Sequence, residues 1–340
     1  MGFFKEMYRD MAIDVGTSNT VIFISGAGIV LNEPSMIARE ILTNKVLAVG
    51  HEALALHEKI HPGVATIRPL VNGVIADYES TKDLVKGLIR KTKTHFGFGI
   101  RNLVISMPSG ITAVEKRAVR YFAKNVGAKN VYMETDIMAA AFGLGIRIEE
   151  PMGNMIVSIG GGTTEIAVIS LGGVVSSESL KLGGINMTNA ILDHFRKAHN
   201  LVLSDLRAEE IKLELGSAYK TGNEQTMTVW GMNVESGLPA SQEIGSETIR
   251  EVLSPIINQI ITGIKKSLEV LIIKPEIAID IYKHGLYLVG GGSLIPGIDK
   301  KITEETTIPV LLCEDPQTVI ARGMGEILQN LKNRRDIYTN

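Results

Sequence analysis

Two stretches of this sequence share one pattern: Ala12-Ile13-Asp14-Val15-Gly16-Thr17-Ser18-Asn19-Thr20-Val21-Ile22 and Ile156-Val157-Ser158-Ile159-Gly160-Gly161-Gly162-Thr163-Thr164-Glu165-Ile166. Each starts with an apolar run, turns at glycine, serine and threonine, and resumes alternating apolar residues, as a β-hairpin does. Asp14 and Ser158 hold matching positions 144 residues apart, a spacing too long for a solenoid repeat. The pattern predicts two related lobes.

The intervening segments alternate between strand and helix patterns. Apolar residues at helical spacing predict helices over 81–93, 113–126 and 208–219, and short apolar runs predict strands over 103–107 and 286–289. Strands followed by amphipathic helices place the chain in the α/β class.

Composition and charge limit the classes of function that the chain can have. The chain has 340 residues, of which 45% are hydrophobic, and a formal net charge of −2, so we expect a large core and no binding of nucleic acid. A single cysteine, Cys313, and the lack of a signal peptide indicate the cytoplasm. No apolar run approaches the roughly 20 residues that a membrane-spanning helix needs.

Three loops have the chemistry of a nucleotide site. Small residues let backbone N–H groups approach a phosphate closely, so the turns at 16–19 and 160–164 are suited to grip a polyphosphate. Asp14, at the end of its strand, can hold Mg²⁺ through water. Gly290-Gly291-Gly292, after the strand 286–289, offers a third close approach suited to a nucleoside.

These loops resemble those of the actin, sugar-kinase and heat-shock-chaperone superfamily. Residues 13–20 and 160–165 resemble its two phosphate loops, and Gly290-Gly291-Gly292-Ser293 resembles its adenosine loop. Longer stretches are similar to the MreB family within it: Gly28-Ile29-Val30-Leu31-Asn32-Glu33-Pro34-Ser35, Ile67-Arg68-Pro69-Leu70, Gly73-Val74-Ile75-Ala76-Asp77, Glu115-Lys116-Arg117, Ile211-Lys212-Leu213-Glu214 and Ala321-Arg322-Gly323.

The resemblance implies an actin-like fold with two duplicated lobes, each a mixed β-sheet flanked by helices, and four subdomains around a cleft for ATP and Mg²⁺. The implied subdomains are IA (1–32 and 67–144), IB (33–66), IIA (145–180 and 243–340) and IIB (181–242). It also implies paired protofilaments of self-associated subunits, with paralogues as further candidate partners, at the inner face of the cell membrane.

The resemblance assigns site residues by matching position. It implies phosphate contacts from Gly16, Thr17, Ser18 and Asn19, and from Gly160, Gly161, Gly162, Thr163 and Thr164; adenosine contacts from Glu209, Lys212, Gly290, Gly291, Gly292 and Ser293; and a water-mediated metal contact from Asp14. Glu209 and Lys212 lie one helical turn apart, so a solvated charge pair is the alternative for these two.

Two departures affect the catalytic step, for which the resemblance implies Asp136 and Thr163. Relatives carry an aspartate where this chain has Ser158, and a water-orienting glutamate where it has Asp136. A serine supplies no negative charge, and a base shortened by one methylene is misplaced. We expect nucleotide binding with slow hydrolysis; the alternative is that Glu134 or Asp136 itself restores the geometry. Ile185 and Thr188 also replace acidic residues of relatives, and the resemblance implies an effect on nucleotide affinity or on subunit contacts.

Two apolar segments favour membrane contact. Phe3, Phe4 and Met7 stand at helical spacing near the N-terminus, and Phe96 and Phe98 form a second apolar loop. A short interfacial helix binds weakly alone, whereas many copies on a filament gain avidity. A packed N-terminal segment is the alternative.

The sequence leaves three rival functions to consider. A chaperone ATPase needs a peptide-binding domain, whereas this sequence ends soon after Gly325, and a sugar kinase would not be expected to match the MreB pattern at 28–35 and 73–77. Ser158 favours the third rival, a non-hydrolysing partner that co-assembles with paralogues. The sequence predicts a cytoskeletal, filament-forming ATP-binding protein with weak hydrolysis that governs cell shape.

Overall fold

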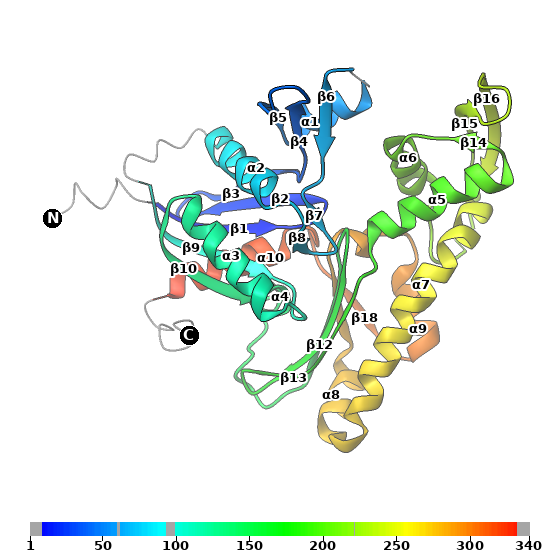
Figure 1. Ribbon diagram of the computed structural model, residues 1–340. Helices are drawn as coiled ribbons and strands as arrows, with labels where there is room; N and C mark the ends of the chain where they lie inside the picture. The colour runs from blue at the N-terminus through cyan, green and yellow to red at the C-terminus, as the bar shows by residue number, and fades with distance from the viewer. Residues whose placement is uncertain (1–8, 60–61, 93–98, 221, 332–340) are drawn as a thin grey trace. The chain divides into compact units, whose positions relative to one another are not determined.

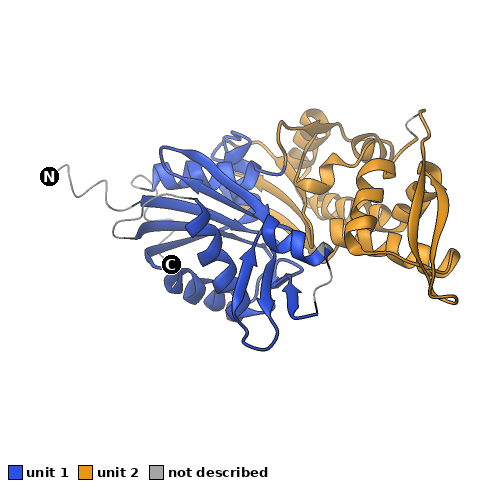
Figure 2. Cartoon of the chain, turned by 90° about the horizontal axis from the view of Figure 1, so that it is seen from above, with its two compact units in different colours: residues 1–150, 171–173, 317–340 blue, residues 151–170, 174–316 orange. Residues whose placement is uncertain are grey.

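The computed structural model describes residues 9–59, 62–92, 99–220 and 222–331 (Figure 1). The chain divides into two compact units, coloured separately in Figure 2. Unit 1 comprises Met1–Glu150, Leu171–Gly173 and Gln317–Asn340, and unit 2 comprises Pro151–Ser170 and Val174–Pro316.

Unit 1 is built on a five-stranded sheet in the order β10-β9-β1-β2-β3. Strands β1, β2 and β3 pair antiparallel, whereas β9 runs parallel to both β1 and β10. The bounds are β1 Arg9–Val15, β2 Asn19–Ile24, β3 Gly28–Pro34, β9 Ile100–Met107 and β10 Ala128–Thr135. The sheet is therefore mixed, with a hairpin at one side and parallel strands at the other.

Unit 2 repeats this topology in its five-stranded sheet, ordered β13-β12-β11-β17-β18. Strand β11 pairs antiparallel with β12 and parallel with β17, which in turn runs parallel to β18. The register is also repeated, because Asp14 pairs with Val21 and Ser158 pairs with Glu165. The bounds are β11 Asn154–Ile159, β12 Thr164–Ser170, β13 Gly173–Leu180, β17 Leu286–Val289 and β18 Val310–Leu312. The predicted duplication and mixed sheets are confirmed.

Helices cover both faces of the sheet in unit 1, and successive side chains of β1 point to opposite faces. Ile13 packs with α2 and α3 on one face, while Ala12 packs with α4 and α10 on the other. The helices are α1 His51–Glu58, α2 Tyr78–Lys91, α3 Ala113–Asn125, α4 Asp136–Gly143 and α10 Val319–Asn330; the smaller sheets contain β4 Ile37–Glu40, β5 Val46–Val49, β6 Val64–Ile67, β7 Leu70–Val71 and β8 Val74–Ile75.

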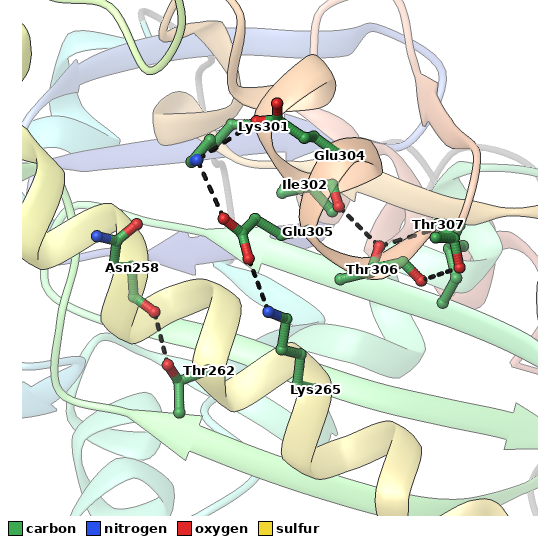
Figure 3. Close-up of polar contacts among 10 residues, drawn as sticks. Asn258, Thr262, Lys265, Lys301, Ile302, Glu304, Glu305, Thr306 and Thr307 are labelled. Carbon is green, nitrogen blue, oxygen red and sulfur yellow. Dashed lines mark hydrogen bonds and ion pairs between the residues drawn. The ribbon is translucent and has the colours of Figure 1, made fainter.

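One large core holds unit 2 together. It joins the sheet to α5, α6 and α7, and includes Val157, Phe195, Ile211 and Ile260. Lys265 of α7 and Lys301 of α9 both donate a hydrogen bond to the Glu305 carboxylate of α9 (Figure 3). The remaining bounds are α5 Gly184–Ala198, β14 Leu201–Val202, α6 Asp205–Leu215, β15 Thr226–Asn233, β16 Pro239–Gly245, α7 Ser246–Glu269, η1 Val270–Ile273, α8 Pro275–His284, η2 Gly291–Leu294 and α9 Ile298–Thr306.

Most predicted elements are present, with shifted ends. The helix predicted from residue 208 begins at Asp205, because the Ser204 hydroxyl caps it by accepting from the Arg207 N–H. Helix α10 belongs to unit 1, whereas the sequence placed 243–340 in one subdomain; the four-subdomain division stays a prediction. Within the described residues, no helix is long and apolar enough to cross a membrane.

Helices α4 and α10 cross at two glycines. A Cβ on Gly323 would lie 1.7 Å from the Ala139 carbonyl oxygen and 2.6 Å from the Gly143 nitrogen. Because both obstacles are backbone atoms, the helices would have to separate. We expect Gly323→Ala to lower the free energy of unfolding by at least about 2 kcal/mol, measured by urea denaturation. Gln329→Ala, on the exposed side of α10, is the control; equal midpoints for both variants would contradict this packing.

Candidate functional site

The same hydrogen bond closes the hairpin turn in each unit. The Gly16 N–H donates to the Asn19 carbonyl at 3.0 Å, and the Gly160 N–H donates to the Thr163 carbonyl at 2.8 Å. A Cβ on Gly16 would stand 2.8 Å from that Asn19 oxygen, so glycine is required for the tight turn. Both predicted phosphate loops therefore have one backbone geometry.

In unit 1, Ser35 fixes the direction of the loop carbonyls. Its hydroxyl donates to the Gly16 carbonyl at 2.6 Å and its N–H donates to the Ser18 carbonyl at 2.8 Å. Since a trans peptide is planar, a carbonyl held by Ser35 turns the next N–H the opposite way. Within the described residues, the Thr17 and Ser18 N–H groups donate to no protein acceptor. Planarity thus turns the Thr17 N–H away from Ser35, whose hydroxyl holds the Gly16 carbonyl.

In unit 2, backbone N–H groups in the first turn of α5 hold the loop carbonyls, as Ser35 does in unit 1. The Gly184 N–H donates to the Gly160 carbonyl at 3.0 Å, and the Ile185 N–H donates to the Gly161 carbonyl at 2.8 Å. These bonds satisfy helix N–H groups that would otherwise lack acceptors. By the same planarity argument they turn the N–H groups of Gly161 and Gly162 outward, and in the described chain neither has a protein acceptor.

Gly183 allows this close contact between helix and loop. Its Cβ would lie 2.5 Å from the Gly160 carbonyl oxygen and 2.8 Å from the Gly161 carbonyl carbon. Any side chain here would therefore separate α5 from the loop.

Lys212 joins α6 to the start of α5. Its ammonium group donates to the Gly184 carbonyl at 3.1 Å, to the Thr188 hydroxyl at 3.1 Å and to the Glu209 carboxylate at 2.7 Å. The i,i+3 pair of Glu209 and Lys212 is therefore present, but Lys212 is only 7% exposed, so its end of the pair is buried rather than solvated. Thr188 also donates to Glu209 at 2.5 Å, which gives the unexplained Thr188 a place in this cluster.

The Gly290 loop packs against the end of β11. Gly290 has φ 84°, and its Cβ would lie 2.4 Å from the Ile159 carbonyl oxygen. Its N–H donates to the Pro316 carbonyl at 2.9 Å, while the Ser293 hydroxyl donates to the Gly290 carbonyl at 2.7 Å. Unit 2 thus brings the second phosphate loop and the predicted adenosine loop together.

Three acidic residues lie at the carboxyl ends of the parallel strands of unit 1. Asp14, the next-to-last residue of β1, accepts a hydrogen bond from Ser106 of β9 at 3.0 Å, and Ser106 is paired in register with Glu134 of β10. Asp136 follows as the first residue of α4, capped by Thr135. This edge is where open α/β sheets bind ligands.

Withdrawal of the Asp14 carboxyl from water raises its pKa to about 6, and the Ser106 hydrogen bond partly offsets that rise. At neutral pH the ionised form prevails, which is the form that a cation requires. Ser158, at the matching position of unit 2, is 5% exposed and carries no charge. The ends of β1 and β11 therefore differ by one carboxylate, although Ser158 is paired across the hairpin with the buried Glu165, whereas Asp14 is paired with Val21.

The donor sets fit a magnesium nucleotide. Outward N–H groups on glycine-rich turns suit phosphate oxygens, and a single carboxylate such as Asp14 suits a metal that keeps its water shell. Within the described residues, no three His, Cys, Asp or Glu side chains are grouped as a direct metal site.

Comparison with known proteins identifies the lineage. A profile described as MreB/Mbl protein matches residues 8–336. The chain belongs to the MreB/Mbl family. It is 38% identical to the cell shape-determining protein Mbl of Bacillus subtilis, over 95% of this chain and 96% of that relative. It is 40% identical to the cell shape-determining protein MreB of Escherichia coli, over 96% and 95% respectively.

Solved MreB structures agree with this assignment. MreB5 of Spiroplasma citri bound to ADP matches with a TM-score of 0.90 at 35% identity, over 98% of this chain and 99% of that one. MreB5 bound to AMPPNP matches with a TM-score of 0.91 at 35% identity, over 97% and 98%. A MamK double helical filament matches over 95% and 99% with a TM-score of 0.79 at 19% identity, which supports the actin-like fold alone.

Sequence reasoning missed the supporting residues. Ser35, Ser106 and Gly184 hold the loops or Asp14, yet each is distant in sequence from its partner, and no local pattern marks them. Other predicted residues lie outside the described part of the chain, namely Phe3, Phe4, Met7, Phe96 and Phe98.

The raised pKa of Asp14 predicts a pH-dependent stability. The folded pKa of Asp14 exceeds the unfolded one. Between about pH 4 and pH 6 the folded state therefore keeps a proton that the unfolded state has lost, and the free energy of unfolding falls as pH rises through that window. Asp14→Asn removes this loss, so at pH 7 without nucleotide the free energy of unfolding of the variant should exceed that of the parent by at most about 3 kcal/mol. Solvent screening at this partly exposed side chain reduces the difference.

Urea denaturation from about pH 4 to pH 8 measures the effect. Ser106→Ala is the matched control, since losing its hydrogen bond should move the pH window upward. Parallel pH profiles for the parent and Asp14→Asn would contradict the raised pKa.

Proposed function

We propose that this chain is a cytoskeletal ATP-binding protein, whose subunits assemble with one another into actin-like filaments that govern cell shape. The observation that carries the proposal is the pair of loops whose carbonyls are held on one side, which turns the N–H groups of Thr17, Gly161 and Gly162 to the other side. The names of the relatives support it: two are cell shape-determining proteins, MreB5 binds ADP and AMPPNP, and MamK forms a double helical filament.

The proposed roles follow the geometry. The N–H groups of 16–19 and 160–164 bind the phosphates, with Asp14 holding hydrated Mg²⁺, which supplies charge neutralisation when bound. Glu209 and the Gly290–Ser293 loop meet the adenosine. Since Lys212 is buried, it serves by holding Glu209 and the start of α5 in place.

We propose slow hydrolysis for two reasons. Ser158 places no charge at the end of β11, and Asp136, which we assign with Thr163 to the catalytic step, is one methylene shorter than the glutamate of relatives. A serine keeps hydrogen-bonding capacity without the charge that would order a metal-bound water. A non-hydrolysing partner that co-assembles with paralogues is the second candidate, and the same observation favours it.

The deciding measurement is phosphate release with ATP and Mg²⁺, with sedimentation of filaments from the same tubes. We expect the purified protein to pellet with little release, and Ser158→Asp with Asp136→Glu to raise turnover by about 100-fold. Each single change should give less than the pair. Brisk release by the parent would overturn slow hydrolysis, and failure to pellet without a paralogue would favour the co-assembly candidate.

We also propose that the filament lies at the inner face of the cell membrane. The apolar residues Phe3, Phe4, Met7, Phe96 and Phe98 support this, because many weak anchors on one filament bind together with avidity.

Liposome co-sedimentation tests the membrane proposal. Removal of residues 1–10 together with Phe96→Ser and Phe98→Ser should abolish filament binding to liposomes, while pelleting of filaments by themselves persists. Removing either anchor alone should weaken binding less than removing both. Unchanged liposome binding by the combined variant would refute the proposal.

A further inference from the structure

The segment 216–220 of unit 2 joins α6 to the loop after η2, the two elements that we propose for the adenosine. It follows α6 directly, and its Ala218 N–H donates to the Pro296 carbonyl at 2.8 Å. The next residue of that loop also packs closely on the segment, because a Cβ on Gly297 would lie 2.6 Å from the Cβ of Tyr219. The segment therefore holds the end of α6 against the end of η2.

Ser217 in this segment carries a backbone carbonyl that lacks a protein donor. The peptide between Ser217 and Ala218 is planar, so the carbonyl points away from Pro296, to which the N–H of the same peptide donates. No donor of the described residues is bonded to this carbonyl, and Ser217 is only 3% exposed. A buried carbonyl without a partner is costly. One acceptor beside the proposed adenosine contacts is therefore available to a ligand.

An acceptor of this kind distinguishes purine bases. Adenine presents an exocyclic amine, which donates hydrogen bonds, whereas guanine and hypoxanthine present an oxygen at the same position, which accepts them. A carbonyl that faces the amine gains a hydrogen bond, whereas a carbonyl that faces the oxygen leaves two acceptors without a donor. The Ser217 carbonyl is therefore suited to select adenine.

Arg250 of α7 holds the chain on both sides of this segment. Its guanidinium donates to the Ser217 hydroxyl at 3.4 Å and forms an ion pair with the Glu224 carboxylate at 2.9 Å. The Arg250 side chain is 12% exposed, so water screens this pair only in part. Glu224 also accepts from the Ser246 hydroxyl. The hydrogen bonds from Ser246 and Arg250 lower the pKa of Glu224, so its carboxylate is ionised at neutral pH and the ion pair persists.

We propose that the Ser217 carbonyl accepts a hydrogen bond from the exocyclic amine of a bound adenine, and that Arg250, paired with Glu224, is the positioning residue that holds this carbonyl in place. The inference rests on the proposed binding of ATP and adds to it the group that selects the base. Substitution of Ser217 would leave the backbone carbonyl present, so the test acts through Arg250 and Glu224.

Calorimetric titration of the purified protein with ATP and with ITP, in Mg²⁺ and below the concentration at which the protein pellets, tests the proposal. ITP carries an oxygen in place of the amine of ATP. The parent should bind ATP about tenfold more tightly than ITP, and Arg250→Ala should reduce this ratio to near one. Partial unfolding lowers the affinity for both nucleotides by the same factor, so a merely structural role would leave the ratio unchanged.

Lys265→Ala is the matched control. Lys265 is also a cation of α7 that pairs with a carboxylate, at 2.7 Å from Glu305 (Figure 3), and within the described residues it makes no hydrogen bond or ion pair to the segment 216–220. This variant should keep the parental ratio of ATP to ITP affinity. An equal fall of the ratio in Lys265→Ala and Arg250→Ala would overturn the positioning role.

A charge exchange tests the ion pair itself. Arg250→Glu and Glu224→Arg each place like charges together and should reduce the ratio, whereas the two changes combined should restore most of it. A parent that binds both nucleotides equally, single variants that keep the parental ratio, or a double variant without recovery would overturn this inference and leave nucleotide binding standing. A parent that binds neither nucleotide would refute the proposed ATP binding and this inference with it.

Discussion

The direction of a few peptide carbonyls determines what this protein can bind. In each unit a glycine N–H closes the hairpin turn onto the residue three positions later. Ser35 in unit 1 and the first turn of α5 in unit 2 donate hydrogen bonds to carbonyls of the turn. Because each peptide is planar, the N–H group that follows such a carbonyl points the opposite way. The sheets, the helix α5 and the strand β3 serve this geometry, since without them the loops would lose the contacts that orient them.

The two units reach this geometry by different supports. Unit 1 uses one side chain, Ser35, whose hydroxyl also lies 2.8 Å from the Thr20 hydroxyl. Unit 2 uses the start of a helix, which brings its own partial positive charge toward the loop. The hairpins were predictable because turn residues and alternation act locally. The supports were not, because Ser35 and Gly184 contact the loops only after distant segments have folded together. Burial of Lys212 likewise depends on α5 packing against α6.

The difference between Asp14 and Ser158 has an energetic side. A carboxylate at the end of a central strand is costly, as the raised pKa of Asp14 shows. Ser158 is only 5% exposed, so an aspartate there would carry a similar desolvation cost unless a cation offset it. Serine removes this cost together with the charge. The missing charge could be predicted from the residue type alone, whereas the size of the avoided desolvation cost depends on burial, which the sequence does not give.

Unit 2 also links its glycine-rich loop to strand β15 through direct contacts. The loop carbonyl of Gly160 is held by Gly184, and the Gly184 carbonyl is held by Lys212 of α6. At the start of the same helix, the Arg207 guanidinium donates to the Thr228 carbonyl of β15 at 3.2 Å, two residues from Trp230. The first of these contacts is a backbone–backbone hydrogen bond, and the other two join a lysine or arginine side chain to a backbone carbonyl. Helix α6 carries both Lys212 and Arg207 and so connects the two ends. A ligand alters assembly only if it binds one arrangement of these contacts better than another. Because Lys212 is buried and bonded to three groups at once, a shift of the start of α5 would either move α6 with it or break the Lys212–Gly184 hydrogen bond.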